Sequence, residues 1–440
     1  MAHILPLEIL RAARKAAEQA EVFWVSSQGT PVHFEANKLK EIQNKESTAV
    51  ALRIIKEGKI GFAAASGDDR VENLIDMALE TSRFGLPAKF QFPSLKDHPQ
   101  VGIFDPDVAR MSVERMIELG SELIAKVSEH APDILCDVEL SKGKRRVHLI
   151  NSQGGEASYD KSFFSLAMEG ILIQDTDMLF VSDEEGTCRL PSGIDDLANR
   201  VIRQLELAKD KATVSTKLLP MIFTPRGVAS ALLTPITLAF NGKMVFEGAS
   251  WLKNRLGEQV FDKKLNLWDD ATIAYGIGSR PCDDEGVPSQ RLSLIANGEV
   301  SDFLYDLQTA ALAGTKSTGH GERADGAFPR PAISSLIVDE GGVSFQAMLE
   351  DMKEGLIVEE LIGAGQGDVL SGDFSGNVLL GYKVENGEIV GRVKDTMIAG
   401  NVYQVLKELL GIGNESRWVN GVLRTPHLYC PRISVTARRS

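Results

Sequence analysis

Apolar residues recur at helical spacing in four segments of the first half of the chain. This spacing predicts amphipathic helices over residues 7–19, 71–83, 113–129 and 194–209. Between the helices lie short apolar runs bounded by turn residues, a pattern that is typical of β-strands. The predicted strands cover residues 22–26, 49–55, 60–65, 137–140, 146–150 and 163–173. The first half is therefore expected to combine helices with β-hairpins.

Glycine and proline mark where these elements are expected to end. Lys56-Glu57-Gly58-Lys59 separates two apolar runs, and a glycine in so short a connection indicates a β-hairpin. Gln28–Gly29 is interpreted as a turn after the first strand, and Gly143 as a break between two strands. A stretch rich in proline, residues 87–106, predicts a long internal loop.

The character of the chain changes after a polar connection, Asp210–Lys217. Beyond it glycines become frequent, and short strands alternate with turns, which favours a β-rich domain with a few helices. We therefore expect a two-domain α+β protein. An N-terminal α+β domain would cover residues 1–212, and a glycine-rich, β-rich C-terminal domain residues 213–440.

Size and composition agree with a folded, water-soluble protein. A chain of 440 residues is too long for one core of ordinary size. The longest apolar run, residues 229–240, contains Pro235 and is shorter than the roughly 18 residues that a membrane span needs. No signal-peptide pattern is present at the start, so we expect a cytoplasmic protein without membrane contact. A formal charge of −13 disfavours direct binding of nucleic acid.

Motifs for catalysis, metal binding and nucleotide binding are absent from the sequence. A zinc hydrolase would place two histidines and a glutamate on one helix, and no two of the seven histidines have that spacing. The chain has neither a Gly-x-Ser-x-Gly nucleophile elbow nor a phosphate-binding loop. The sequence therefore predicts no catalytic residue, no metal ligand and no cofactor in this chain.

Three short motifs follow one another in the second half: the turn Asp283–Pro288, the hairpin Ile295–Gly298 and the loop Ser317–Arg323. In this order they resemble the C-terminal half of the TldD/PmbA family. Residues 34–40 and 151–154 are similar to the first domain of that family, so the resemblance extends over nearly the whole chain. It implies the two-domain α+β architecture of that family.

One departure from the family pattern decides which member the chain resembles. The TldD-type member looks like a metalloprotease with a His-Glu-x-x-x-His helix, and the PmbA or TldE-type member lacks that motif. The matching helix is expected to begin near Pro225, and the ligand positions are occupied by Leu233–Leu238. No side chain there supplies an imidazole, and Pro235 is expected to bend or strain the helix.

The resemblance therefore implies a non-catalytic subunit of PmbA/TldE type. Such a subunit would pair with a TldD-like metalloprotease, which would hold the metal, and the pair would process unfolded peptides. A homodimer is also compatible with this interpretation. Two alternatives stay open: a metal-dependent peptidase with dispersed residues Asp283, Glu285, His320 and Glu322, or a protein-binding modulator of DNA gyrase, after a historical label of the family.

Six residues of the shared motifs are candidates for a substrate cavity or a subunit interface. They are Asp283, Glu285, Gly286, Thr318, Gly319 and Arg323. Arg323 would bind a carboxylate there, because a guanidinium pairs with it through two parallel hydrogen bonds. The alternative interpretation is that the charged members form ion pairs that hold the fold together.

Overall fold

The computed structural model describes residues 4–67, 73–175, 177–324 and 327–437. Strands before residue 188 form one seven-stranded sheet, in the order β4-β3-β1-β5-β6-β7 with β2 paired to β1. Its strands are β1 (Gln19–Glu35), β2 (Lys38–Ile42), β3 (Lys45–Lys56), β4 (Lys59–Ser66), β5 (Leu135–Asn151), β6 (Glu156–Gln174) and β7 (Asp177–Thr187). All neighbours in this sheet are antiparallel.

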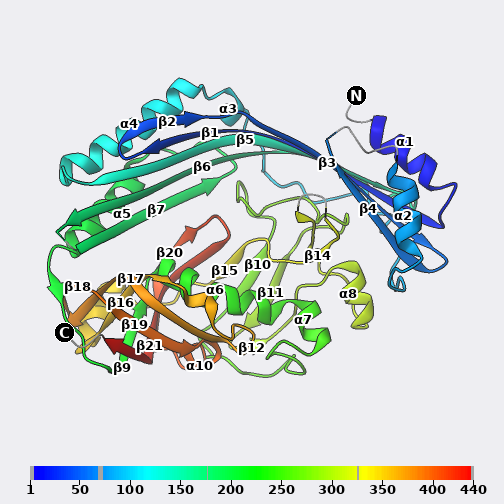
Figure 1. The fold of residues 1–440 in the computed structure, drawn as a ribbon. Helices are drawn as coiled ribbons and strands as arrows, with labels where there is room; N and C mark the ends of the chain where they lie inside the picture. Colours follow the sequence, from blue (N-terminus) through cyan, green and yellow to red (C-terminus); the bar gives the residue numbers. More distant parts are fainter. Residues whose placement is uncertain (1–3, 68–72, 176, 325–326, 438–440) are drawn as a thin grey trace.

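Helices cover both ends of the first sheet. They are α1 (Ile4–Ala13), α2 (Leu74–Ser82), α3 (Pro106–Arg110), α4 (Val113–His130) and α5 (Asp195–Leu207). Figure 1 shows α1 and α2 at one end of the long strands and α4 and α5 at the other. Leu10 of α1 and Leu74 of α2 pack on Leu52 of β3, whereas Leu123 of α4 and Val201 of α5 share a second cluster of buried side chains.

The second half forms a larger, mixed sheet of twelve strands. Its central path is β12-β11-β10-β15-β21-β9-β16-β17-β18-β8, with β19 paired to β17 and β21, and β20 to β21. The strands are β8 (Lys211–Ala212), β9 (Lys217–Phe223), β10 (Leu267–Asp270), β11 (Arg291–Ala296), β12 (Glu299–Val300), β15 (Leu336–Val338), β16 (Glu354–Ile362), β17 (Asp373–Glu385), β18 (Glu388–Val393), β19 (Thr396–Asn401), β20 (Gly411–Val419) and β21 (Leu423–Ala437). The predicted division of the chain at residue 212 stays a prediction.

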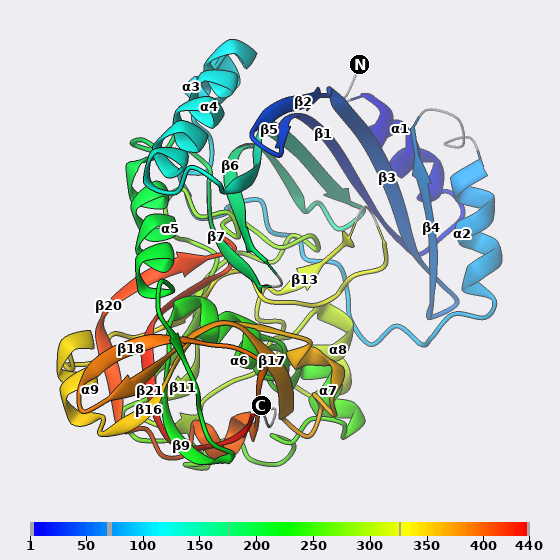
Figure 2. The ribbon, with the colours of Figure 1, turned by 60° about the vertical axis from the view of Figure 1, so that its left-hand side comes forward.

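Short elements complete the second half. They are the pair β13 (Gly321–Glu322) and β14 (Arg330–Pro331), the helices α6 (Pro225–Phe240), α7 (Gly242–Glu247), α8 (Leu307–Leu312), α9 (Phe345–Asp351) and α10 (Val402–Val405), and the 3-10 turn η3 (Ala364–Gln366). In Figures 1 and 2 the first sheet lies over the second half, with α5 beside the junction. The two halves share a core, because Ile357 of β16 and Tyr382 of β17 pack in the cluster that contains α4 and α5.

The α+β prediction is confirmed, and so is the predicted hairpin. Lys56 of β3 pairs directly with Lys59 of β4, which leaves a two-residue turn. Glu57 and Gly58 both have positive φ, of 51° and 70°, as the commonest tight hairpin turn requires. The four predicted helices are confirmed at shifted ends, and residues 71–72 of one lie outside the described residues. The first ends at Ala13, and Gln19, its predicted last residue, already belongs to β1.

One predicted turn and one predicted break between strands are wrong. Gln28 and Gly29 lie inside β1, Gly143 lies inside β5, and Gly29 and Gly143 are direct partners across the two strands. The ring of Phe163, from β6, covers both glycines. A side chain at Gly143 would collide with this ring and with the carbonyl oxygen of Gln28. The glycine therefore makes room for an aromatic ring rather than for a turn.

Replacing Gly143 with alanine is expected to lower the free energy of unfolding by about 1–3 kcal/mol, the usual cost of overpacking. Gly29→Ala is the matched control, because its added carbon would lie 3.4 Å from Phe163 Cζ, an ordinary contact distance. Urea denaturation of both variants measures the difference. Equal losses of stability in the two variants would mean that contact with Phe163 is not the reason for a glycine at position 143.

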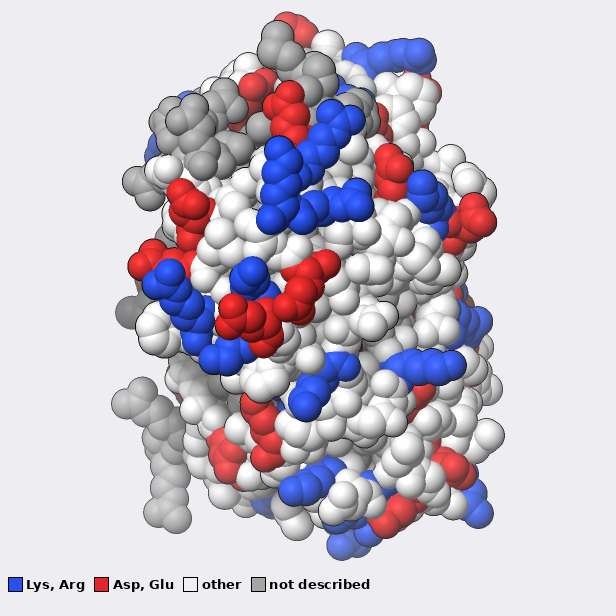
Figure 3. Space-filling model, turned by 90° about the vertical axis from the view of Figure 1, so that its right-hand side faces the viewer, with Lys and Arg blue, Asp and Glu red and all other residues white. Residues whose placement is uncertain are grey.

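The charges on one face and the character of the helices bear on the expectations for nucleic acid and membranes. On the face shown in Figure 3, which includes α2, lysine and arginine alternate with aspartate and glutamate, so this face presents no continuous basic surface for nucleic acid. Among the described residues, no helix has the length and apolar character that crossing a membrane would take.

Candidate functional site

The helix expected near Pro225 is confirmed and is α6. β9 leads into it through Thr224, whose hydroxyl accepts a hydrogen bond from the Gly227 amide at 3.2 Å and so caps the helix. Pro225 occupies the first turn, where its missing N–H costs nothing. The helix continues unbroken through Pro235 to Phe240, since side chains on its buried face hold it in the core.

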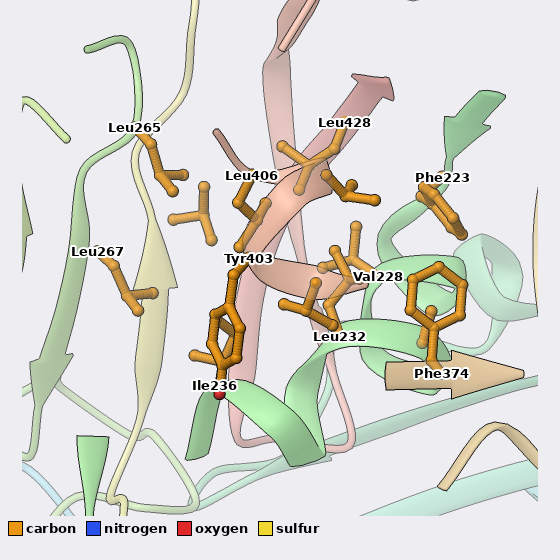
Figure 4. Close-up of a cluster of buried hydrophobic side chains, with 14 of the residues drawn as sticks. Phe223, Val228, Leu232, Ile236, Leu265, Leu267, Phe374, Tyr403, Leu406 and Leu428 are labelled. Carbon is orange, nitrogen blue, oxygen red and sulfur yellow. The ribbon is translucent and has the colours of Figure 1, made fainter. Parts of the chain in front are cut away.

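At the positions where the family motif would place metal ligands, α6 has apolar and hydroxyl side chains. Leu233 and Leu238 are half-buried and Thr234 is exposed. Leu232 and Ile236, on the adjoining face, point into the core shown in Figure 4. A cavity of about 30 Å³ beside the helix has only apolar walls, formed by Val228, Leu232, Leu233, Ile236, Leu265, Leu267, Ile295, Leu336, Val338, Leu406, Leu423 and Leu428.

These residues do not fit a catalytic metal. Zinc in such a site takes imidazole, carboxylate or thiolate ligands from three side chains. None of the side chains around this cavity carries such a group. Within the described ranges, no group of three or more His, Cys, Asp and Glu residues is placed to hold a metal ion.

The six candidate residues lie together, and all are buried. The Asp283 carboxylate accepts hydrogen bonds from the amides of Glu285, Val287 and Gly321, at 3.0, 2.9 and 2.8 Å. It therefore shapes its own turn and attaches it to the 317–323 loop. Burial and the nearby Glu285 raise the pKa of Asp283. The Thr318 hydroxyl accepts from the Tyr305 amide at 2.8 Å.

The two candidate glycines occupy positions where the backbone itself requires them. Gly286 and Gly319 both have φ of +78°, which other residues rarely adopt. A Cβ on Gly319 would in addition lie 2.7 Å from the carbonyl oxygen of Pro288. Gly319 thus lets the 317–323 loop lie directly against the 283–288 turn.

Glu285 and Arg323 belong to a buried network of four charges that joins the two halves. Arg53, on β3, donates to Glu285 Oε1 at 2.5 Å and lies 3.0 Å from Glu21 Oε1, on β1. Arg323 also pairs with Glu21. No member is more than 2% exposed. Burial disfavours the charge on Arg53, but the two glutamates outweigh this and raise its pKa. The Arg53 guanidinium also lies 4.9 and 5.0 Å from the ring centres of Phe90 and Phe92.

The carboxylate that Arg323 binds in this structure therefore belongs to the same chain. Arg323 is also the one candidate of the six that lines a cleft between the halves. The expected role of the six in a substrate cavity or subunit interface stays a prediction. Glu21 and Arg53 are members of the network that the sequence motifs do not indicate.

His320, which belongs to the dispersed-site alternative, has both ring nitrogens engaged. Nδ1 lies 2.9 Å from Thr318 Oγ1, and Nε2 lies 3.0 Å from Asp269 Oδ1. The side chain is buried. This contact joins the 317–323 loop to β10, and it leaves neither nitrogen available to a substrate.

A separate cleft of about 310 Å³ opens at the start of α6, with Thr224, Glu359 and His427 among its walls. Burial, with Arg417 and Arg203 nearby, lowers the pKa of His427 to about 4. The ring packs against Phe345 at 4.7 Å between centres. The folded protein therefore keeps this imidazole neutral.

Acid is expected to destabilise the fold through His427. Between pH 6.5 and about 4 the unfolded state binds a proton at this residue and the folded state does not, so the free energy of unfolding falls as the pH falls. The loss should reach about 3 kcal/mol at the lower end of this range. Urea denaturation across the range should show a shallower pH dependence for His427→Gln. Parallel curves for the two proteins would contradict this assignment.

Comparison with known proteins agrees with the fold and the motifs. The model of the PmbA/TldA metallopeptidase C-terminal domain matches residues 216–437, and the model of domain 1 of this metallopeptidase matches residues 20–82. The chain belongs to the PmbA/TldD family.

Relatives of this PmbA/TldD family member match over nearly their full length. Metalloprotease PmbA of Escherichia coli O157:H7 is 26% identical over 424 residues, which are 92% of this chain and 90% of that protein. Uncharacterized protein MJ0231 of Methanocaldococcus jannaschii is 27% identical over 413 residues, 92% of this chain and 94% of that protein.

Solved structures share the fold. TldE from Thermococcus kodakarensis superposes with a TM-score of 0.87 at 21% identity and covers 98% of this chain and 100% of its own. A putative modulator of a DNA gyrase from Thermotoga maritima gives a TM-score of 0.89 at 21% identity, with 99% and 100% covered. At these identities the likeness extends to the fold alone.

Proposed function

We propose that this chain is the non-catalytic, PmbA/TldE-type subunit of a metal-dependent protease that acts on unfolded peptides. The observation that carries the proposal is that α6 has Leu233 and Leu238 at the positions where the family motif would require two histidines. The partner in this proposal is a TldD-type chain that retains the His-Glu-x-x-x-His helix and holds the metal. The names of the relatives include metalloproteases of both PmbA and TldD type, which supports placing the chain in a metal-dependent protease.

A non-catalytic partner needs no ionisable group at the scissile bond. It needs an interface and strand edges that hydrogen-bond an extended peptide. The outer strands of the first sheet are β4 and β7, and the chain itself already bonds part of each edge. The Leu86 carbonyl accepts from the Ile60 amide of β4, and the Gln204 side chain bonds the amide and carbonyl of Ser182 on β7, so a peptide would have to add to the remainder. The four cysteines are free and buried, which agrees with the reducing cytoplasm in which we place the assembly.

Reconstitution tests the proposal. The chain alone, a TldD-type relative alone and the mixture are each assayed for bound zinc and for cleavage of an unstructured peptide. We expect zinc and chelator-sensitive cleavage only where the TldD-type chain is present, and a stable complex of the two. If the chain alone bound stoichiometric zinc and cleaved the peptide until a chelator was added, the non-catalytic role would be wrong. Gel filtration of the chain alone tests whether it also forms a homodimer.

A further inference from the structure

A cleft of about 490 Å³ lies between the first sheet and the second half. Arg145 and Lys161 reach it from β5 and β6, and Arg280 and Arg323 from the opposite side. The carboxylates of Asp284 and Glu322 also line it, so positive charges outnumber negative ones by four to two. Phe163, Ile277 and Ile333 form apolar parts of the wall.

Arg280 is a wall residue of this cleft and has buried hydrogen-bond donors without a partner. Its side chain is about nine-tenths buried, at 9% exposure, yet neither Nε nor Nη2 has a hydrogen-bond partner. These two nitrogens form one edge of the guanidinium, the edge that fits both oxygens of a carboxylate. Arg146 uses that edge on Asp160, with distances of 2.5 Å from Nε and 2.7 Å from Nη2. Arg323 Nη1 and Arg145 Nε are also buried without a partner.

Neighbouring groups hold Arg280 charged and in place. Burial disfavours its charge, but Asp284 and Asp283 outweigh this and raise its pKa. The Lys161 ammonium donates to the carbonyl oxygens of Ile277 and, at 2.9 Å, of Ser279. Lys161 thereby ties the segment just before Arg280 to β6. A buried donor without an acceptor is costly, so this arrangement favours a bound group that supplies acceptors.

We propose that this cleft binds a carboxylate, held side-on by Arg280 and flanked by Arg145 and Arg323. The flat, two-oxygen shape of a carboxylate matches the free edge of Arg280, and the apolar wall suits the organic part of the same molecule. Two sources carry this chemistry: a small carboxylic acid, and the C-terminal carboxylate of a peptide. The peptide source rests on the proposed function, and the site itself does not.

Direct binding to the purified chain tests the site without any protease. The probe is a fluorescent, unstructured pentapeptide that ends in phenylalanine, with either a free or an amidated C-terminus, and binding is followed by fluorescence anisotropy. We expect the free acid to bind about tenfold or more tightly than the amide, as charge-assisted hydrogen bonds allow. Succinate should compete, and inorganic phosphate should compete more weakly.

Arg280→Lys keeps the positive charge and removes the two-nitrogen edge, so it should weaken binding of the free acid about tenfold. Arg146→Lys is the matched control. Arg146 follows Arg145 of the cleft wall but pairs with Asp160 outside the cleft, so this change should leave binding of the free acid unchanged. Thermal melting establishes that each variant is folded. If Arg280→Lys does not fold, Arg145→Gln tests the cleft from the first sheet.

Each outcome decides the matter. Equal binding of acid and amide, wild-type binding by Arg280→Lys, binding of phosphate without carboxylates, or no binding of any probe would each overturn the site. Binding of succinate, measured directly by calorimetry, without binding of the peptide would support the site with a small acid as its source. The chain could also bind carboxylates but form no active complex with a TldD-type relative. That result would support the carboxylate site and contradict only the proposed function.

Discussion

Replacing Arg53 with methionine is expected to lower the free energy of unfolding by about 3–5 kcal/mol, the usual result of removing one partner from a buried ion pair. Methionine fills similar space between Phe90 and Phe92 but leaves Glu285 without its cationic partner. Glu21 keeps only Arg323. The loss is measured as the shift of the urea midpoint, followed by tryptophan fluorescence.

A double variant and a surface variant test this explanation. Arg53→Met with Glu285→Gln should cost less than the two single changes summed, because no charge then stays unpaired at that end of the network. Arg146→Met breaks an exposed pair with Asp160 and should cost at most about 1 kcal/mol. If Arg53→Met cost no more than Arg146→Met, the network would not hold the two halves together.

The local pattern of the sequence predicts most of the helices and the β3–β4 hairpin, because both depend on periodicities within a few residues. It does not predict the length of β5. Gly143 has the local character of a break, yet the strand continues through it, since Phe163 packs over the glycine and tertiary packing outweighs the local preference.

One member of the charged network leaves a trace in the sequence, and its pairing leaves none. Arg53 is a single charge inside an apolar run, and a charge in such a position needs a buried partner, whereas Glu21 stands before such a run, just after Glu18. Their mutual pairing across β1 and β3 depends on the register of the sheet. Their pairing with Glu285 and Arg323 depends on how the two halves pack, over separations of 232 and 302 residues. Periodicity carries no information at that range.

The family motifs located the second half of the network because they follow the turn and loop that meet there. They do not distinguish a cavity from a buried ion pair, since both use the same residue types. To distinguish them, the burial and the hydrogen-bond partners of each residue must be known. Glu285 and Arg323 are each at most 2% exposed and form ion pairs. Arg280, which is not one of the six candidates, has Nε and Nη2 without a hydrogen-bond partner.

Leu232→Ala is expected to lower the free energy of unfolding by about 2–5 kcal/mol, because α6 serves here as a packing helix. Leu232 is 2% exposed and lies among the apolar side chains that surround the small cavity beside the helix (Figure 4). Removing three carbons would enlarge a cavity that the sheet cannot close. Urea denaturation measures the loss.

Thr234→Glu is the matched control on the same helix. It returns the carboxylate of the family motif at an exposed position, so stability should change by no more than about 0.5 kcal/mol. In the reconstituted assembly, Thr234→Glu should leave cleavage unchanged, since no imidazole stands beside it on α6. A large loss of cleavage with Thr234→Glu, together with little loss of stability with Leu232→Ala, would mean that α6 takes part in the chemistry rather than in the core.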